Sequence, residues 1–291
     1  MDVIIPRSLD EALATKAARP EAVPIAGGTD LLVDLNFGRL RPEVILDLSH
    51  VPEMKEFTCG DVVEMGALTT FVRIIEENEL GALVEAARTV GSPQIRNRAT
   101  IGGNLGTASP AGDSLPVFYA YDAEVIVGSH GALPRVVPVG DFFHGPRRNA
   151  LEGHELILGV RWNQVSGPSV FSKIGTRNAM VISVASLCLA VDGPRRSARI
   201  ALGSVGPTVL RAHAAERLLG QALEERDLWN DPAGSLDADE VASVAEAVAA
   251  AAMPIDDTRG TARYRRHACR VLARRAIGWA FPGRSDKARP G

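Results

Sequence analysis

The chain has 291 residues and a mass of 30.9 kDa, with 32 basic and 35 acidic side chains and a formal charge of -3. This near-neutral balance gives no electrostatic reason to expect nucleic acid or an anionic membrane surface as a partner. The three cysteines, Cys59, Cys188 and Cys269, are scattered, and no CxxC or HExxH motif occurs. The sequence therefore argues against a metal ion, an iron–sulfur cluster or a disulfide framework held by this chain.

The first residues and the apolar runs of the chain bear on its location. Residues 1–6 contain neither a basic segment nor a long apolar one. No stretch approaches the roughly 18 apolar residues that a membrane-spanning helix needs. We therefore expect a cytoplasmic protein without membrane insertion.

Short helices and strands are predicted to alternate in the first part of the chain. Ser8 and Glu11 form a capping-box pattern that begins a helix running to about Ala18. The apolar run 23–26 predicts a buried strand, and Thr29 is predicted to cap a second helix that ends before Gly38. Strands are then predicted at 44–48 and 62–66, and helices at 70–77 and 82–90.

The next stretch, residues 91–115, is polar and glycine-rich and is predicted to be a long loop. A composition change near 164–168 indicates a linker. The remaining predicted elements are a helix at 117–122, a hairpin of 124–127 and 135–139, a hairpin of 186–191 and 198–205, helices at 212–219, 238–252 and 261–280, and a disordered tail at 282–291.

Two glycine-pair turns carry the chemical signal. In Ile25–Asp30 a strand runs through Gly27 and Gly28 into a helix start, where the backbone can approach a ligand closely and exposed amides suit an anion such as a phosphate. Thr100–Asn104 repeats the pattern with a further set of free amides. One such turn is commonplace, but two suggest a pyrophosphate held from two sides. Neither GxGxxG nor GxxxxGK[ST] occurs, so a dinucleotide bound here needs a scaffold other than the Rossmann fold.

These two segments carry a resemblance to a known family. AGGTDL at 26–31 and TIGGNL at 100–105, followed by ASPAGD at 108–113, resemble the two FAD-binding signatures of the FAD-binding (medium) subunits of molybdenum hydroxylases, of the xanthine dehydrogenase and carbon monoxide dehydrogenase type. The resemblance continues through FSKIGTR at 171–177 and ISVAS at 182–186. It covers about residues 1–280 in family order and spacing.

The resemblance implies a set of cofactor-binding residues and no catalytic or metal-binding residue on this chain. The implied FAD contacts are Ala26, Gly27, Gly28, Thr29, Asp30, Thr100, Ile101, Gly102, Gly103, Asn104, Ser109, Asp113, Ile157 and Lys173. Lys173 would reach the flavin, where a cation could favour the negative charge of the reduced form. On local pattern alone, Lys173 is typical of a surface lysine, and Asp113 of a cap for a helix beginning at Ser114.

The implied fold is α+β. It consists of a two-subdomain FAD-binding fold of the PCMH (vanillyl-alcohol-oxidase-like) type and a C-terminal α+β domain with a short antiparallel sheet and helices. The expected divisions are an N-terminal α/β subdomain at 1–53, a second α/β subdomain at 54–166, the C-terminal domain at 167–281 and the tail at 282–291. FAD would lie in the cleft between the first two.

The implied function is one stage of an electron relay. A large molybdopterin-binding subunit would oxidise the substrate, and a small subunit with two [2Fe–2S] clusters would pass electrons to FAD on this chain, in a dimer of heterotrimers. An external acceptor, NAD, O2 or a quinone, would receive them. A purine or other N-heteroaromatic substrate is expected, with carbon monoxide dehydrogenase or aromatic-CoA reductase medium subunits as alternatives. A stand-alone FAD-dependent reductase and a non-catalytic interaction module are the alternatives from other classes.

The last predicted helix, 261–280, and the residues just before it are rich in arginine. Tyr264, Val271 and Leu272 recur there at helical spacing on another face. We expect the arginines to form a solvated or subunit-contacting face rather than a nucleic-acid site. They are Arg259, Arg263, Arg265, Arg266, Arg270, Arg274 and Arg275.

Overall fold

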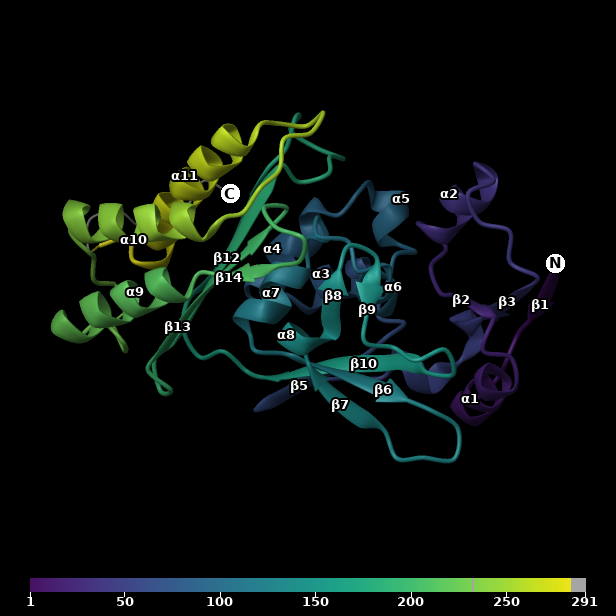
Figure 1. Cartoon of the computed structure of the whole chain (residues 1–291). Helices are drawn as coiled ribbons and strands as arrows, with labels where there is room; N and C mark the ends of the chain where they lie inside the picture. Colours follow the sequence, from purple (N-terminus) through teal and green to yellow (C-terminus); the bar gives the residue numbers. More distant parts are fainter. Residues whose placement is uncertain (232, 284–291) are drawn as a thin grey trace. The chain divides into compact units, whose positions relative to one another are not determined.

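The computed structural model describes residues 1–231 and 233–283, so residues 284–291 of the predicted tail lie outside the described residues. The chain forms two compact units, and it passes between them several times (Figure 1). Unit 1 contains residues 1–76, 90–109 and 122–164, and unit 2 contains residues 77–89, 110–121 and the chain from 165 onward. No helix of the described residues is long and apolar enough to cross a membrane.

Unit 1 begins with a three-stranded parallel sheet of order β1-β3-β2. Its strands are β1 (Asp2–Ile4), β2 (Val23–Ile25) and β3 (Val44–Asp47), and α1 (Leu9–Ala18) provides the crossover that two parallel strands require. The Ser8 hydroxyl accepts the Glu11 amide at the start of α1, as predicted. In α2 (Leu31–Asn36) the N-cap is Asp30, without a side-chain cap bond, so the predicted Thr29 cap is wrong.

A five-stranded antiparallel sheet of order β4-β5-β10-β6-β7 forms the rest of the unit 1 framework. The central strand β10 (Leu156–Asn163) pairs with β5 (Val62–Gly66) and β6 (Glu124–Gly128), and a register shift lies between Ile157 and Gly159. The other elements are β4 (Phe57–Thr58), β7 (Arg135–Pro138), β8 (Phe143–Gly145), β9 (Arg148–Asn149), α3 (Phe71–Glu77), α8 (Val139–Phe142), η1 (Leu48–His50) and η2 (Pro52–Lys55).

The glycine-rich stretch predicted as a long loop contains two short helices, α5 (Pro93–Arg96) and α6 (Ile101–Thr107). Side-chain caps begin both helices, because Ser92 accepts the Ile95 amide and Thr100 accepts the Gly103 amide. The loop prediction is wrong here because glycine has a poor intrinsic helix propensity, whereas caps and contacts with the rest of the fold determine the local structure.

Unit 2 is built on a four-stranded antiparallel sheet of order β11-β12-β13-β14. All residues of β12 (Ala185–Asp192) are buried, as expected for a strand covered on both faces. Its neighbours are β11 (Ser169–Ile174), β13 (Ser197–Gly203) and β14 (Leu210–Arg211). The helices are α4 (Ala82–Thr89), α7 (Leu115–Ala120), α9 (His213–Glu225), α10 (Ala238–Ala251) and α11 (Ala262–Ala280).

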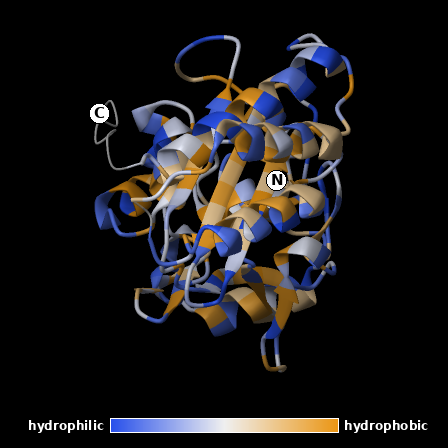
Figure 2. Cartoon of the chain, turned by 90° about the vertical axis from the view of Figure 1, so that its left-hand side faces the viewer, coloured by the Kyte–Doolittle hydropathy of each residue, from blue (hydrophilic) through white to orange (hydrophobic). Residues whose placement is uncertain are grey.

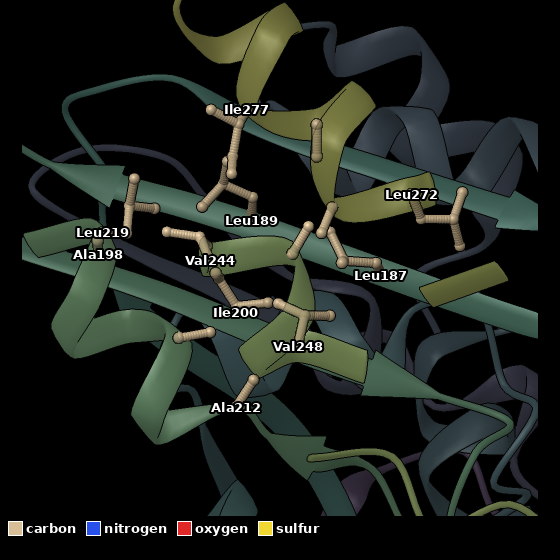
Figure 3. Packing of buried hydrophobic residues seen from close by; sticks show 14 of the residues in the cluster. Leu187, Leu189, Ala198, Ile200, Ala212, Leu219, Val244, Val248, Leu272 and Ile277 are labelled. Atoms are coloured by element: carbon tan, nitrogen blue, oxygen red, sulfur yellow. The ribbon is translucent and has the colours of Figure 1, made fainter. Parts of the chain in front are cut away.

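The main core of unit 2 lies between this sheet and helices α9, α10 and α11. Leu187 and Leu189 of β12 pack with Val248 of α10 and Leu272 and Ile277 of α11 (Figure 3). The strands of the sheet are largely hydrophobic, whereas the helices alternate between hydrophilic and hydrophobic residues (Figure 2). Helices α4 and α7 also contact the sheet, so segments from the middle of the chain complete unit 2.

Helix α11 corrects one expectation about the arginines. Arg265 does not belong to a solvated face, because it is only 3% exposed. Arg263, Arg266, Arg274 and Arg275 are exposed, as expected. Burial of one guanidinium within a basic stretch cannot be recognised from composition, since it depends on the acceptors that the fold places around it.

Candidate functional site

The first glycine turn, Gly27-Gly28, is fixed by close backbone packing. A Cβ on Gly27 would lie 1.9 Å from the Arg98 carbonyl oxygen, which leaves no room for a side chain. Gly28 has a φ of +74°, which glycine adopts readily. The amides of Gly27, Gly28 and Thr29 donate to no acceptor among the described residues. The turn therefore offers donors of the kind that an anion accepts.

The second glycine segment is organised differently, because the amides of residues 101–104 are already bonded. The Ile101 amide donates to the Thr69 carbonyl at 3.0 Å, and the Gly102 amide donates to the Ala67 carbonyl at 2.8 Å. The Gly103 amide donates to Thr100 Oγ1 at 3.0 Å. The expectation of free amides here is therefore wrong, since the start of α6 docks on residues 67–69 and on its own cap.

The bulge in β10 supports this docking. The Leu158 carbonyl accepts the Ala67 amide at 2.8 Å, and the Ala67 carbonyl in turn accepts Gly102. A Cβ on Gly102 would lie 2.6 Å from that of Ala67, so only glycine fits. Irregular pairing of this kind often lies next to functional sites.

The structure brings the two glycine segments together in unit 1, although they are far apart in sequence. Gly27 packs against the Arg98 backbone, just before Thr100. Thr107 Oγ1, at the end of α6, donates to Asp30 Oδ2 at 2.9 Å. Ile157 lies beside α6, because a Cβ on Gly106 would be 3.7 Å from Ile157 Cδ1. Ser109 is half-buried at the end of the same stretch of unit 1.

Two other predicted site residues, Asp113 and Lys173, form a buried ion pair in unit 2. Lys173 Nζ lies 2.5 Å from Asp113 Oδ2, and it also donates to the carbonyls of Thr89 and Val181. The Lys173 side chain is only 10% exposed, so the surface-lysine alternative is wrong. Asp113 is not a helix cap either, because α7 begins at Leu115 without a side-chain cap bond.

Hydroxyl groups complete the surroundings of the Asp113 carboxylate. Ser183 Oγ donates to Asp113 Oδ1 at 2.7 Å, and Thr89 Oγ1 lies 3.0 Å from Oδ2. Burial raises the pKa of the Asp113 carboxyl above its usual value, while Lys173, Ser183 and Thr89 offset part of this effect. A carboxylate that is costly to ionise yet paired with a cation is typical of functional sites as well as of structural networks.

Sequence reasoning missed several residues of these arrangements. Thr107 and Thr69 position the second glycine segment, and Thr89 and Ser183 contact Asp113. Thr107 and Ser183 stood within or beside the recognised motifs, but a hydroxyl in a motif does not identify its partner. Thr69 and Thr89 gave no signal, because only the fold brings them close to residues 101 and 113.

Unit 1 can be tested for its fit to a flavin dinucleotide. Such a ligand has an anionic pyrophosphate, and residues 27–29 offer amides without an acceptor among the described residues. The Thr69 hydroxyl is also buried without a described partner, although it lies next to the start of α6. These residues fit the group, with donors concentrated on the first segment rather than shared by both.

Fold and site together define a two-unit flavin-binding protein on a non-Rossmann scaffold. Residues 1–162 match the family described as "FAD binding domain in molybdopterin dehydrogenase", and residues 171–280 match "CO dehydrogenase flavoprotein C-terminal domain". The chain belongs to this family, as an FAD-binding oxidoreductase subunit of the molybdenum hydroxylase type. The predicted family, fold class and FAD cofactor are confirmed.

Individual relatives agree with this assignment. The nicotinate dehydrogenase FAD-subunit of Eubacterium barkeri is 35% identical over 230 residues, which are 74% of this chain and 77% of that protein. The putative xanthine dehydrogenase FAD-binding subunit of Escherichia coli K12 is 28% identical over 96% of both chains. Carbon monoxide dehydrogenase of Hydrogenophaga pseudoflava contains a chain with a TM-score of 0.82 and 27% identity, covering 96% of this chain and 97% of that one.

Proposed function

We propose that this chain is the flavin-carrying electron-transfer subunit of a molybdenum-containing hydroxylase. It receives electrons from two [2Fe–2S] clusters on a small partner subunit and delivers them to an external acceptor, NAD, O2 or a quinone. A large molybdopterin-binding subunit oxidises the substrate, and the whole is a dimer of heterotrimers. The observation that carries the proposal is the meeting of the two glycine segments in unit 1, through Gly27 against Arg98 and Thr107 with Asp30.

FAD supplies the redox chemistry when it is bound, and the residues of this chain bind and orient it. The amides of residues 27–29 would donate to the pyrophosphate, whereas the amides of residues 101–104 are already bonded within the protein and would pack against the cofactor without donating to it. Ile157 adds an apolar surface beside Gly106. The family resemblance also makes Ser109, Asp113 and Lys173 proposed FAD contacts. Within unit 2, Asp113 and Lys173 form a buried ion pair.

The division of labour among three subunits has support in the sequence. A [2Fe–2S] cluster requires four ligands, which are usually cysteines. This chain has three cysteines, of which Cys188 and Cys269 are buried in unit 2 and Cys59 is exposed. We infer that the clusters belong to a partner chain.

The proposed substrate is a purine or another N-heteroaromatic compound. The support comes from the relatives named for nicotinate and xanthine, whose names specify nitrogen-containing aromatic rings. The alternative is carbon monoxide as substrate, which the carbon monoxide dehydrogenase relative supports. In this proposal the flavin-binding chain does not contact the substrate, so its own residues do not choose between the two.

The complex purified from its native host provides the test. We expect this chain to copurify with two partners, with FAD, molybdenum and iron bound, and with bleaching of the visible spectrum upon addition of xanthine or nicotinate under anaerobic conditions. Carbon monoxide in place of the heteroaromatic compound is the matched control for substrate class.

Different outcomes would identify the alternatives. A yellow single chain that reduces a small substrate with NADPH would contradict the relay and favour a stand-alone reductase. A complex bleached by carbon monoxide alone would retain the relay but overturn the substrate assignment. Lys173→Met provides a further test of the flavin site, because an unchanged FAD reduction potential would remove Lys173 from it.

A further inference from the structure

Arg265 of α11 is a buried cation with unusual bonding. Its Nη1 donates to the carbonyls of Ser204 at 2.7 Å and Val184 at 3.0 Å. Its Nη2 forms an ion pair with Asp257 Oδ1 at 2.5 Å. A guanidinium removed from water is costly unless acceptors surround it, so the fold provides three acceptors for this one side chain.

Each of the two carbonyls that accept from Arg265 is connected to Asp113 through a further hydrogen bond. Val184 follows Ser183, whose hydroxyl donates to Asp113 Oδ1 at 2.7 Å. The Ser204 amide donates to the Pro110 carbonyl at 2.8 Å, three residues before Asp113. Arg265 therefore fixes a hydrogen-bond partner of the Asp113 side chain on one route and the backbone that precedes Asp113 on the other.

The surroundings of Arg265 are not arranged for stability alone. Ser204 has a φ of +63°, in the left-handed region that favours glycine. The Ser204 hydroxyl and Arg265 Nε are both buried without a hydrogen-bond partner among the described residues. Unsatisfied groups and backbone strain at one place are costly, and they concentrate where function requires a particular geometry.

We propose that Arg265 is a positioning residue for the Asp113–Lys173 pair, acting through Val184 and Ser204. If Arg265 served only to fill the core, an apolar residue of similar size would stabilise unit 2 at least as well. If it positions Asp113, its loss loosens the carboxylate and releases Lys173 while the core remains intact. The consequence for flavin binding rests on the proposed function, whereas the positioning itself concerns only this chain.

Lysine labelling of the full chain without FAD tests the proposal directly. The sequence has four lysines, Lys16, Lys55, Lys173 and Lys287, so mass spectrometry can follow each separately. In the wild type we expect fast labelling at the exposed Lys55 and slow labelling at Lys173, whose three hydrogens are all donated. In Arg265→Met we expect labelling of Lys173 to become about tenfold faster or more, because its local opening is easier.

Two protected groups distinguish local loosening from unfolding. Lys16 in unit 1 donates to the Pro20 and Ala22 carbonyls and should stay protected. The Cys188 thiol in β12 is fully buried, so it reports on the unit 2 core. Arg270→Met is the matched control variant, since Arg270 lies on the same helix and pairs with Glu246 instead. It should leave Lys173 protected, and Arg265→Lys should restore part of the protection.

Unchanged Lys173 labelling in a folded Arg265→Met chain would overturn the proposal, as would equal release of Lys173 by Arg270→Met. If Arg265→Met also exposes Cys188, Asp257→Asn decides instead. This variant keeps Arg265 and removes the negative charge that pairs with Arg265 and with Arg259. A rise in Lys173 labelling there supports the proposal, and no rise rejects it. Failure of the proposed function would appear elsewhere, as a chain purified from its native host without FAD or without the two partner chains.

Discussion

At the scale of single residues, the buried pair of Asp113 and Lys173 has the clearest energetic consequences. Its carboxylate is enclosed by Lys173, Ser183 and Thr89, and burial is the dominant influence on its ionisation. A buried pair of this kind contributes little net stability compared with apolar residues, but loss of one partner leaves the other charge uncompensated. Stability and pH dependence therefore respond differently to single and double substitutions.

Asp113→Asn is expected to destabilise unit 2 by about 3 kcal/mol or more, because Lys173 stays buried without its counter-charge. Adding Lys173→Met should recover much of that loss. Urea unfolding of the two variants and of Lys173→Met measures the coupling free energy. Equal destabilisation by the double and single variants would contradict the pairing.

The same carboxyl predicts a pH dependence with a definite sign. Since burial raises its folded pKa, the folded state binds the proton more tightly than the unfolded state does. The free energy of unfolding should therefore decrease as pH rises from the ordinary Asp pKa through the raised one, and Asp113→Asn should remove this decrease. Glu155→Gln is a control of opposite sign, because the hydrogen bond with Arg135 lowers the Glu155 pKa and its stabilisation is lost in acid.

At the scale of elements, the sequence predicted the helices and strands whose signals lie within a few neighbouring residues. The Ser8 cap, the hairpins of β6 with β7 and of β12 with β13, and the positions of α10 and α11 follow from capping, turns and periodicity. The helix α6 was missed because its formation depends on Ala67 and Thr69. The sequence likewise did not predict that Asp113 and Lys173 pair with each other, since they lie on segments far apart along the chain.

The turn between β2 and α2 gives the element-scale prediction. Gly27→Ala would place a Cβ against the Arg98 carbonyl, so the two glycine segments must separate. We expect a loss of about 1–3 kcal/mol in stability, as for other overpacked sites, together with weaker FAD binding. Gly60→Ala is the matched control, because its Cβ would meet no atom within 4 Å. Calorimetric unfolding and FAD titration measure both effects, and FAD affinity equal to that of the control would contradict the proposed contact.

At the scale of the whole molecule, the interleaving of the two units governs how the chain can be divided. Residues 1–162 and 171–280 match two separate family descriptions, yet α4 and α7 precede residue 162 and pack on the sheet of unit 2. All residues of α7 are buried. A break at the linker therefore removes the partners of these helices.

We expect a fragment of residues 1–164 to expose α4 and α7, to bind a hydrophobic dye and to aggregate. Coexpression with residues 165–291 should restore a dye-free, soluble complex, because unit 2 can then reassemble around β12 and β13. Hydrogen exchange at Leu115–Ala120 is the measurement. Full protection of this segment in the fragment alone would contradict the interleaved arrangement.

The crossings of the chain between the two units also limit which recombinant genes can encode a folded protein. They occur after residues 76, 89, 109, 121 and 164, so each unit is encoded by separated stretches of the gene. A single genetic crossover between two relatives, wherever it falls, must divide at least one unit between two parents. Viable hybrids of this family should therefore arise mainly between close relatives or by exchange of several blocks at once.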